Sequence, residues 1–166
     1  MQILLVLILA GTALAQNTTP LWLRGYAVIP TPQSVKLEDR DVAIDNAWTL
    51  DRGKVPARSI AVRTLAADAD AMHGLRLRTG GDAKAVRLAV APGAVKTSTG
   101  DIELDAQAYR VRIGDTLVEI TGNSEAGLFY GVQTFLQLLK RDARGTLLLP
   151  KGVIEDWPKL QLRFLH

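Results

Sequence analysis

Carboxylate side chains are the first candidates for chemistry in this sequence, and the most regular group lies in its second half. Asp101, Glu103 and Asp105 occupy alternate positions, so on an extended strand they would point to one side. A row of oxygen ligands of this kind suits a calcium ion. The plainer interpretation, which we favour, is a solvated strand face.

Two further sites invite a catalytic interpretation. Glu155 and Asp156 are adjacent acids, but neighbours on an extended segment point to opposite sides, so the two carboxylates would not share a site. Asp156 precedes Trp157 and Pro158, which predicts that it fixes a turn. His73 has no Ser or Asp partner in a known motif, and we predict a contact between its ring and the dipole at a helix end.

Composition excludes several kinds of site. The 166 residues include 20 Lys plus Arg, 17 Asp plus Glu, 2 His and no Cys. Without cysteine there is no disulfide framework, zinc ribbon or thiol nucleophile. The cations are scattered and the net charge is only +3, which argues against nucleic-acid binding. We therefore predict no metal, no cofactor and no nucleic-acid partner, and the chain is too short for a (β/α)₈ barrel of roughly 250 residues.

The beginning of the chain has the pattern of an export signal. An apolar run at residues 3–10 precedes Ala13 and Ala15, the small residues typical of a cleavage site. The run is shorter than the roughly 20 residues that a membrane-spanning helix needs. We expect residues 1–15 to be a cleaved signal peptide, residues 16–25 to be a leader, and the protein to be secreted or periplasmic, without membrane contact after cleavage.

Apolar periodicity predicts two helices. The first would cover residues 55–73 and end at Gly74. The second would cover residues 124–140, behind a cap at Asn123 or Ser124. Their buried stripes would consist of Val62, Leu65, Ala69 and Met72 in the first helix and of Leu128, Val132, Phe135 and Leu139 in the second.

Alternating apolar residues predict six or seven strands joined partly by hairpins. Gly114 and Asp115 link two such runs, which is a strong hairpin signal, and residues 26–29 predict a further short strand. Gly127 and Gly131, four apart in the second helix, predict a close approach to the sheet, since glycine weakens a helix. The expected fold class is α+β, a two-layer sandwich with a mostly antiparallel sheet and both helices packed on one face.

Four segments, which we call the motif segments, resemble those of a known family in order and spacing. They are residues 29–35 (IPTPQSV), 107–111 (QAYRV), 125–139 (EAGLFYGVQTFLQLL) and 154–163 (IEDWPKLQLR). This part of the chain resembles the N-terminal accessory domain of glycoside hydrolase family 20, the β-N-acetylhexosaminidases.

The resemblance implies that residues 26–153 form a non-catalytic α+β domain and that residues 154–166 begin a catalytic (β/α)₈ barrel, expected C-terminal to His166. In that family a barrel Asp–Glu pair hydrolyses terminal N-acetylhexosamine residues of glycoconjugates by substrate-assisted retaining catalysis. Glu155 and Asp156 do not align with that pair, so the chain would be an inactive fragment of an exported enzyme. Arg163 matches a family arginine that binds hydroxyls of the terminal sugar; an ordinary interdomain ion pair is the alternative.

Two other functions remain open from the sequence. In the first alternative, the chain is a stand-alone secreted carbohydrate-binding or interaction module. Sugar binding would require exposed aromatic side chains that stack on sugar rings. Related accessory domains also precede the barrels of family 84 hexosaminidases and of α-glucuronidases, so the resemblance leaves the substrate open.

Overall fold

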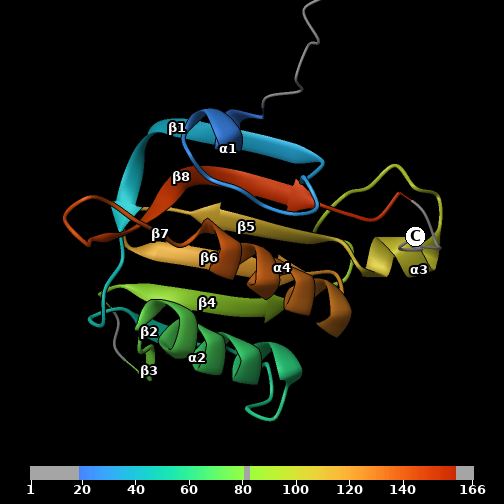
Figure 1. Ribbon diagram of the computed structural model, residues 1–166. Coiled ribbons are helices and arrows are strands. Elements are labelled where there is room, and N and C mark those ends of the chain that lie inside the picture. The colour runs from blue at the N-terminus through green and yellow to red at the C-terminus, as the bar shows by residue number, and fades with distance from the viewer. Residues whose placement is uncertain (1–18, 81–82, 160–166) are drawn as a thin grey trace, which may run out of the picture.

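The computed structural model describes residues 19–80 and 83–159, which fold around one eight-stranded sheet. The strands are β1 (Ser34–Ala43), β2 (Thr49–Asp51), β3 (Arg78–Thr79), β4 (Ala85–Val90), β5 (Tyr109–Ile113), β6 (Leu117–Gly122), β7 (Lys140–Arg141) and β8 (Leu147–Asp156). The helices are α1 (Pro20–Leu23), α2 (Ile60–His73), α3 (Ile102–Ala106) and α4 (Glu125–Leu138). Figure 1 shows α2 and α4 on the same face of the sheet.

The α+β class is confirmed, but the sheet is mixed, so the prediction of a mostly antiparallel sheet is wrong. The order across the sheet is β1-β8-β5-β6-β4-β2-β3, with β7 paired to β8. The pairs from β1 to β6 are antiparallel, and those from β6 to β3 are parallel. The connection from β2 through α2 accounts for the parallel pairs of β2 with β3 and β4, because a crossover through a helix returns the chain parallel to the strand it left. The predicted hairpin at Gly114 and Asp115 is confirmed by the pairing of β5 with β6.

Helix α2 begins later than predicted. The Val55 amide donates to the Arg52 carbonyl and the Ser59 amide donates to the Pro56 carbonyl, so turns occupy the chain up to Ile60. The first three members of its predicted stripe are buried, whereas Met72 is 68% exposed. At the other end Gly74 stops the helix in the left-handed conformation with φ 66°, as glycine permits.

Helix α4 follows the prediction closely. The Ser124 side chain accepts the amides of Ala126 and Gly127 at 3.1 and 3.3 Å and so caps the helix. The four apolar residues of its predicted stripe are all buried in the core against the sheet.

The predicted close approach of Gly127 and Gly131 to the sheet is confirmed. A Cβ added to Gly127 would lie 2.4 Å from the carbonyl oxygen of Ala108, and one added to Gly131 would lie 2.8 Å from Cγ2 of Ile120. Both distances are far below the roughly 3.5–4.0 Å of a normal contact, so α4 packs closer than side chains would allow.

Two segments predicted as strands have other structures. Residues 26–28 are irregular, because the Tyr26 amide donates to the Leu21 carbonyl and folds this segment back on α1. Residues 101–105 belong to α3 and its cap, since the Asp101 carboxylate accepts the amides of Glu103 and Leu104. The expected strand face of Asp101, Glu103 and Asp105 is therefore wrong.

The predicted signal peptide at residues 1–15 lies outside the described residues. Within the described ranges, no helix is long and apolar enough to cross a membrane.

Candidate functional site

The one predicted substrate contact, Arg163, lies outside the described residues, which end at residue 159. What the structure does describe is the end of β8, the strand from which the chain leads toward Arg163. A hollow lies at this end of the molecule, and we take it as the candidate functional site.

The hollow has a volume of about 290 Å³ and is lined from four parts of the chain. Its lining residues are Ile29 and Pro30, Gln107 and Tyr109, Tyr130, Gln133, Thr134 and Gln137, and Asp156, Trp157 and Pro158. Each of these residues belongs to one of the four motif segments. The fold therefore brings the motif segments, which are far apart in the sequence, to one place beside the end of β8.

Three lining residues form a buried polar cluster. Tyr109, Thr134 and Asp156 are 4%, 3% and 8% exposed. The Tyr109 hydroxyl donates to Oδ2 of Asp156 at 3.3 Å and lies 2.5 Å from Oγ1 of Thr134, which is placed to donate to it. Asp156 Oδ1 accepts the Gln33 amide at 3.2 Å. These bonds join β5, α4, β8 and the segment before β1, and they satisfy polar atoms that would be costly to bury unpaired.

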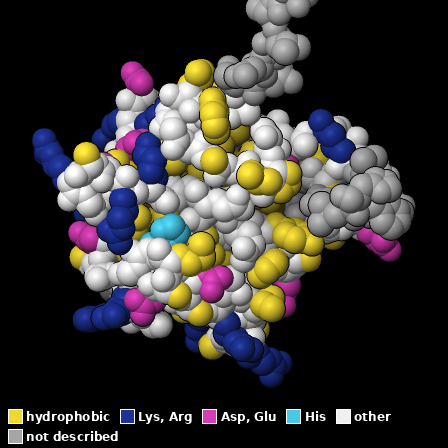
Figure 2. All heavy atoms as spheres, viewed as in Figure 1, with side chains coloured by type: hydrophobic (Ala, Val, Ile, Leu, Met, Phe, Trp, Pro, Cys, Tyr) yellow, Lys and Arg dark blue, Asp and Glu magenta, His cyan; other side chains and the backbone are white. Residues whose placement is uncertain are grey.

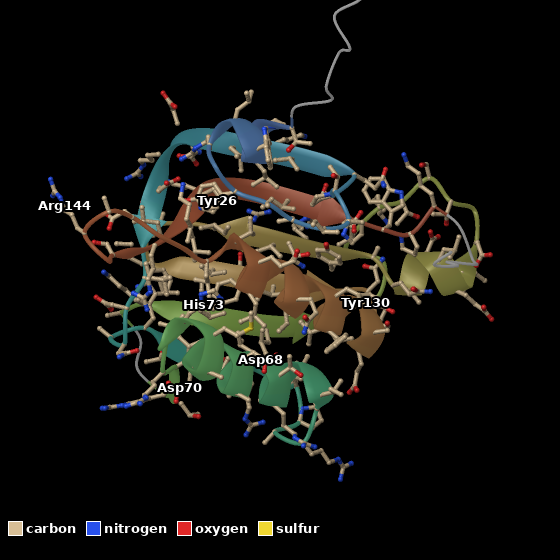
Figure 3. All side chains as sticks on the ribbon, in the orientation of Figure 1. Tyr26, Asp68, Asp70, His73, Tyr130 and Arg144 are labelled. Carbon is tan, nitrogen blue, oxygen red and sulfur yellow. The ribbon has the colours of Figure 1, made fainter. Side chains whose placement is uncertain are left out.

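The rim of the hollow is less buried and partly apolar. Ile29 and Tyr130 are exposed, and Figure 3 shows Tyr130 on α4. Gln137 holds the rim in place, because its Oε1 accepts the Ile29 amide at 2.8 Å. Gln107 is also engaged, since its Nε2 donates to the Glu103 carbonyl at 3.2 Å. The rim is partly apolar, and the polar groups beneath it are already hydrogen-bonded to one another. Such an arrangement suits the burial of a partner surface better than the transfer of protons to a substrate.

Glu155 and Asp156 point to opposite sides of β8, as predicted. Glu155 accepts the Arg110 guanidinium at 2.5 Å, whereas Asp156 faces the hollow and Gln33. The two carboxylates do not share a site, and the two described partners of Asp156, Gln33 and Tyr109, lie far away from it in the sequence.

The acidic residues around α3 are used internally. Asp105 accepts the hydroxyls of Thr97 and Thr99, and these bonds, that from Thr97 first, lower the pKa of its carboxyl. Asp101 caps the helix. No cluster of three or more His, Cys, Asp or Glu side chains placed to hold a metal occurs in the part of the chain that the structure describes.

His73 lies at the end of α2, as Figure 3 shows, with the Arg141 guanidinium donating to its carbonyl oxygen. Burial of the ring is the main cause that lowers the pKa of His73; a hydrogen bond with the Leu136 backbone raises it, and the charge of Arg141 lowers it further. The net shift of the pKa is downward, and the contact with a helix dipole stays a prediction.

Sequence reasoning missed Tyr109 and Thr134 as members of a polar cluster. The bonds that the structure describes between them and with Asp156 span 25 and 47 residues. Their presence in two different motif segments was the one signal available.

Comparison with known proteins agrees with this reading of the motif segments. Residues 25–157 match the model of glycosyl hydrolase family 20, domain 2. The lacto-N-biosidase of Bifidobacterium bifidum is 32% identical over 126 residues, which cover 70% of this chain and 10% of that protein. The β-N-acetylhexosaminidase of Cellulomonas fimi is 30% identical over 144 residues, covering 84% of this chain and 27% of that protein.

The fold is shared with solved structures as well. The Streptomyces plicatus β-hexosaminidase in complex with GlcNAc superposes with a TM-score of 0.61 and 30% identity, covering 78% of this chain and 26% of that one. The chain thus spans about a quarter or less of these three relatives. The match of the family model over most of the chain shows that it belongs to glycosyl hydrolase family 20, whose domain 2 it contains at residues 25–157.

Proposed function

We propose that this chain is the accessory, non-catalytic domain of an exported β-N-acetylhexosaminidase, and that it braces a catalytic (β/α)₈ barrel that follows it in the longer protein. The observation that carries the proposal is the hollow beside the end of β8, where all four motif segments meet. A surface formed by these segments at the point where the chain leaves the sheet is well placed to receive the next domain.

The activities of the relatives support the reaction class. Two of them are named as β-hexosaminidases and one as a lacto-N-biosidase, and this chain matches only a small part of each. Under the proposal, hydrolysis of terminal N-acetylhexosamine by substrate-assisted retaining catalysis belongs to the longer protein. Arg163 would then contribute donors to hydroxyls of the terminal sugar.

The two faces of the sheet favour one side for docking. The face opposite α2 and α4, which we call the open face, carries a row of alternating charges across four strands. Asp51 pairs with Arg87 at 2.7 Å, and Glu119 lies 3.9 Å from Arg87 and 4.0 Å from Arg112. Such a row is well solvated and would be costly to bury. Another domain is therefore more readily accommodated on the other face.

The helix side carries exposed apolar side chains instead. Met72 on α2, Tyr130 on α4 and Ile29 beside Gln137 of α4 are all exposed. Figure 2 shows apolar side chains gathered over the middle of this face and Lys and Arg mainly around its edge. Exposed apolar side chains with charged ones around them are typical of an interface, so in this proposal the barrel lies against the helices.

An independent sugar-binding module is the weaker proposal. Sugar-binding surfaces present exposed aromatic rings. Trp48 is fully buried and Trp157 is half-buried in the hollow, which leaves Trp22 as the one strongly exposed tryptophan.

Two measurements test the accessory role. The purified 166-residue chain should release no p-nitrophenol from p-nitrophenyl N-acetylglucosaminide, whereas the intact protein encoded by the complete reading frame should. Turnover by the short chain, or a complete reading frame without a hydrolase domain, would contradict the proposal.

The docking face is tested in the intact protein. Met72→Glu should lower its Tm by placing an unpaired charge in the interface, while leaving the stability of the 166-residue chain unchanged. Val153→Glu is the matched control, because Val153 lies on the open face between the cationic residues Arg112 and Lys36 and its change should affect neither protein. Equal effects of the two changes on the intact protein would contradict docking on the helix side.

A further inference from the structure

We infer that the segment at residues 52–63, which runs from the end of β2 into α2, binds an anionic polysaccharide. This contact would be made by the accessory domain itself, away from the hollow at the end of β8. The choice of a polysaccharide rests on the proposed function, in which the longer protein acts on glycoconjugates. The site itself is carried by the charges of this segment and by the hollows beside it.

The segment at residues 52–63, which we call the cationic segment, has four positive charges and no acid. The charges belong to Arg52, Lys54, Arg58 and Arg63. The sequence has no Asp or Glu from residue 52 to residue 67, and within the described ranges none of the four cations forms an ion pair. Three of them are exposed, whereas Arg52 donates to the Val55 carbonyl at 2.9 Å. Positive charges gathered without counter-charges attract an anionic partner.

The start of α2 adds to this positive potential. Free amides at a helix N-terminus carry partial positive charge, so acids are favoured there and cations are not. The first turn of α2 has no acidic residue, and Arg58 directly precedes the cap residue Ser59. Ser59 is 6% exposed, yet its side chain does not bind these amides and its Oγ has no hydrogen-bond partner among the described residues. The local charge pattern opposes the helix, which indicates a role outside it.

The cationic segment lies at an edge of the molecule. Figure 1 shows the start of α2 and the loop before it at the bottom of the view, and Figure 2 shows Lys and Arg side chains gathered at the same edge. These cations are therefore presented to solvent on one side of the domain.

Two adjoining hollows accompany the cationic segment. One has a volume of about 380 Å³ and includes Lys54 in its lining, and the other has a volume of about 490 Å³ and includes Arg52. Both are lined by Gly53 and Arg87, so together they form one groove beside the segment. A groove suits a linear polymer, whereas a membrane surface is flat.

The lining of the groove favours a polysaccharide over a nucleic acid. The carboxylates of Asp51 and Glu125 line one hollow each, and Asp51 is paired with Arg87 at 2.7 Å. Carboxylate oxygens accept the hydroxyls that every sugar ring supplies, but they repel phosphate groups. The cationic segment also has no aromatic side chain on which bases could stack. A polymer that combines hydroxyls with spaced negative charges matches this mixture.

The test titrates the 166-residue chain and the intact protein with a heparin-derived oligosaccharide at low ionic strength, using calorimetry. The triple variant Lys54→Gln, Arg58→Gln, Arg63→Gln removes the exposed charges of the segment. The matched control is Lys36→Gln, Lys96→Gln, Arg144→Gln, which removes the same net charge at exposed cations without an ion pair in the described ranges.

We expect the variant of the cationic segment to bind at least about tenfold more weakly than the wild type, and the control to bind less than about threefold more weakly. Binding through four cations releases counterions, so the logarithm of the affinity should fall with that of the salt concentration with a slope of about −3. The slope should become about −1 in the variant of the cationic segment, and N-acetylglucosamine oligomers, which are neutral, should not compete.

Several results would overturn the inference. They are the absence of saturable binding, equal weakening by the two triple variants, and binding by the short chain but not by the intact protein. Equal affinity for single-stranded DNA of the same charge would overturn the choice of a polysaccharide. Failure of the proposed function is distinguishable, since the intact protein would then hydrolyse no N-acetylglucosaminide while the binding of the heparin oligosaccharide stays measurable.

Discussion

Replacement of Gly127 by alanine probes the closest contact between α4 and the rest of the fold. The added Cβ would lie 2.4 Å from the Ala108 carbonyl oxygen and 3.1 Å from that of Ala106. Neither carbonyl is free to move, because the Ala108 oxygen accepts the Asn123 amide at 2.9 Å and the Ala106 oxygen accepts the Ser124 hydroxyl at 2.6 Å.

The net effect follows from three opposing contributions. Overpacking of a rigid site costs about 1–3 kcal/mol, and disturbance of the bond between Asn123 and Ala108 costs about 1 kcal/mol more. The higher helix propensity of alanine returns about 1 kcal/mol. We expect a loss of about 2 kcal/mol in the free energy of unfolding, which lowers Tm by about 4–8 °C for a chain of this size.

Urea and thermal unfolding of the 166-residue chain measure this loss. Gly131→Ala is the matched comparison, since it has the same propensity gain but meets Cγ2 of Ile120, a side-chain atom that can move aside. It should be close to neutral, whereas the larger Gly131→Val should destabilise by about 1–3 kcal/mol through overpacking. A Gly127→Ala chain as stable as the Gly131→Ala chain would refute the argument that the backbone contact at Ala108 controls this packing.

Two further predictions concern pH and the sugar contact. Because the pKa of His73 is lowered on folding, the unfolded chain binds more protons as the pH falls below the ordinary histidine value of about 6.5, so the free energy of unfolding should decrease from there toward pH 5. Urea unfolding at pH 7.5 and 5 should show a smaller decrease for His73→Gln, and equal decreases would exclude this ring as the cause. In the intact enzyme Arg163→Ala should weaken sugar binding by about 1.5–3 kcal/mol, as measured by KM or by titration with N-acetylglucosamine; unchanged values would remove Arg163 from the site.

The elements that formed as predicted are those determined by neighbours close in the chain. The stripe of α4, its cap at Ser124 and the hairpin at Gly114 all depend on spacings of a few residues, which apolar periodicity and turn chemistry report directly. The close approach of Gly127 and Gly131 to the sheet could also be predicted from the sequence. Glycine weakens a helix, so two glycines inside one indicate a packing constraint from outside the helix.

Other features depended on choices between competing local structures. The segment at residues 101–105 alternates like a strand, yet the Asp101 side chain stabilises the first turn of α3 instead. The parallel pairing of β4 with β2 and β6 is also invisible in the strands themselves, since the same apolar runs pair in either direction.

The α+β class, the two main helices and, through the motif segments, the family resemblance could all be inferred from the residues alone, and the comparison bears the resemblance out. Strand direction and the meeting of the four motif segments in one hollow became apparent only in the folded chain. The bond from the Gln33 amide to Asp156 joins residues 123 positions apart. Contacts over such distances arise from the packing of the whole sheet and its helices, and no local preference of either residue specifies them.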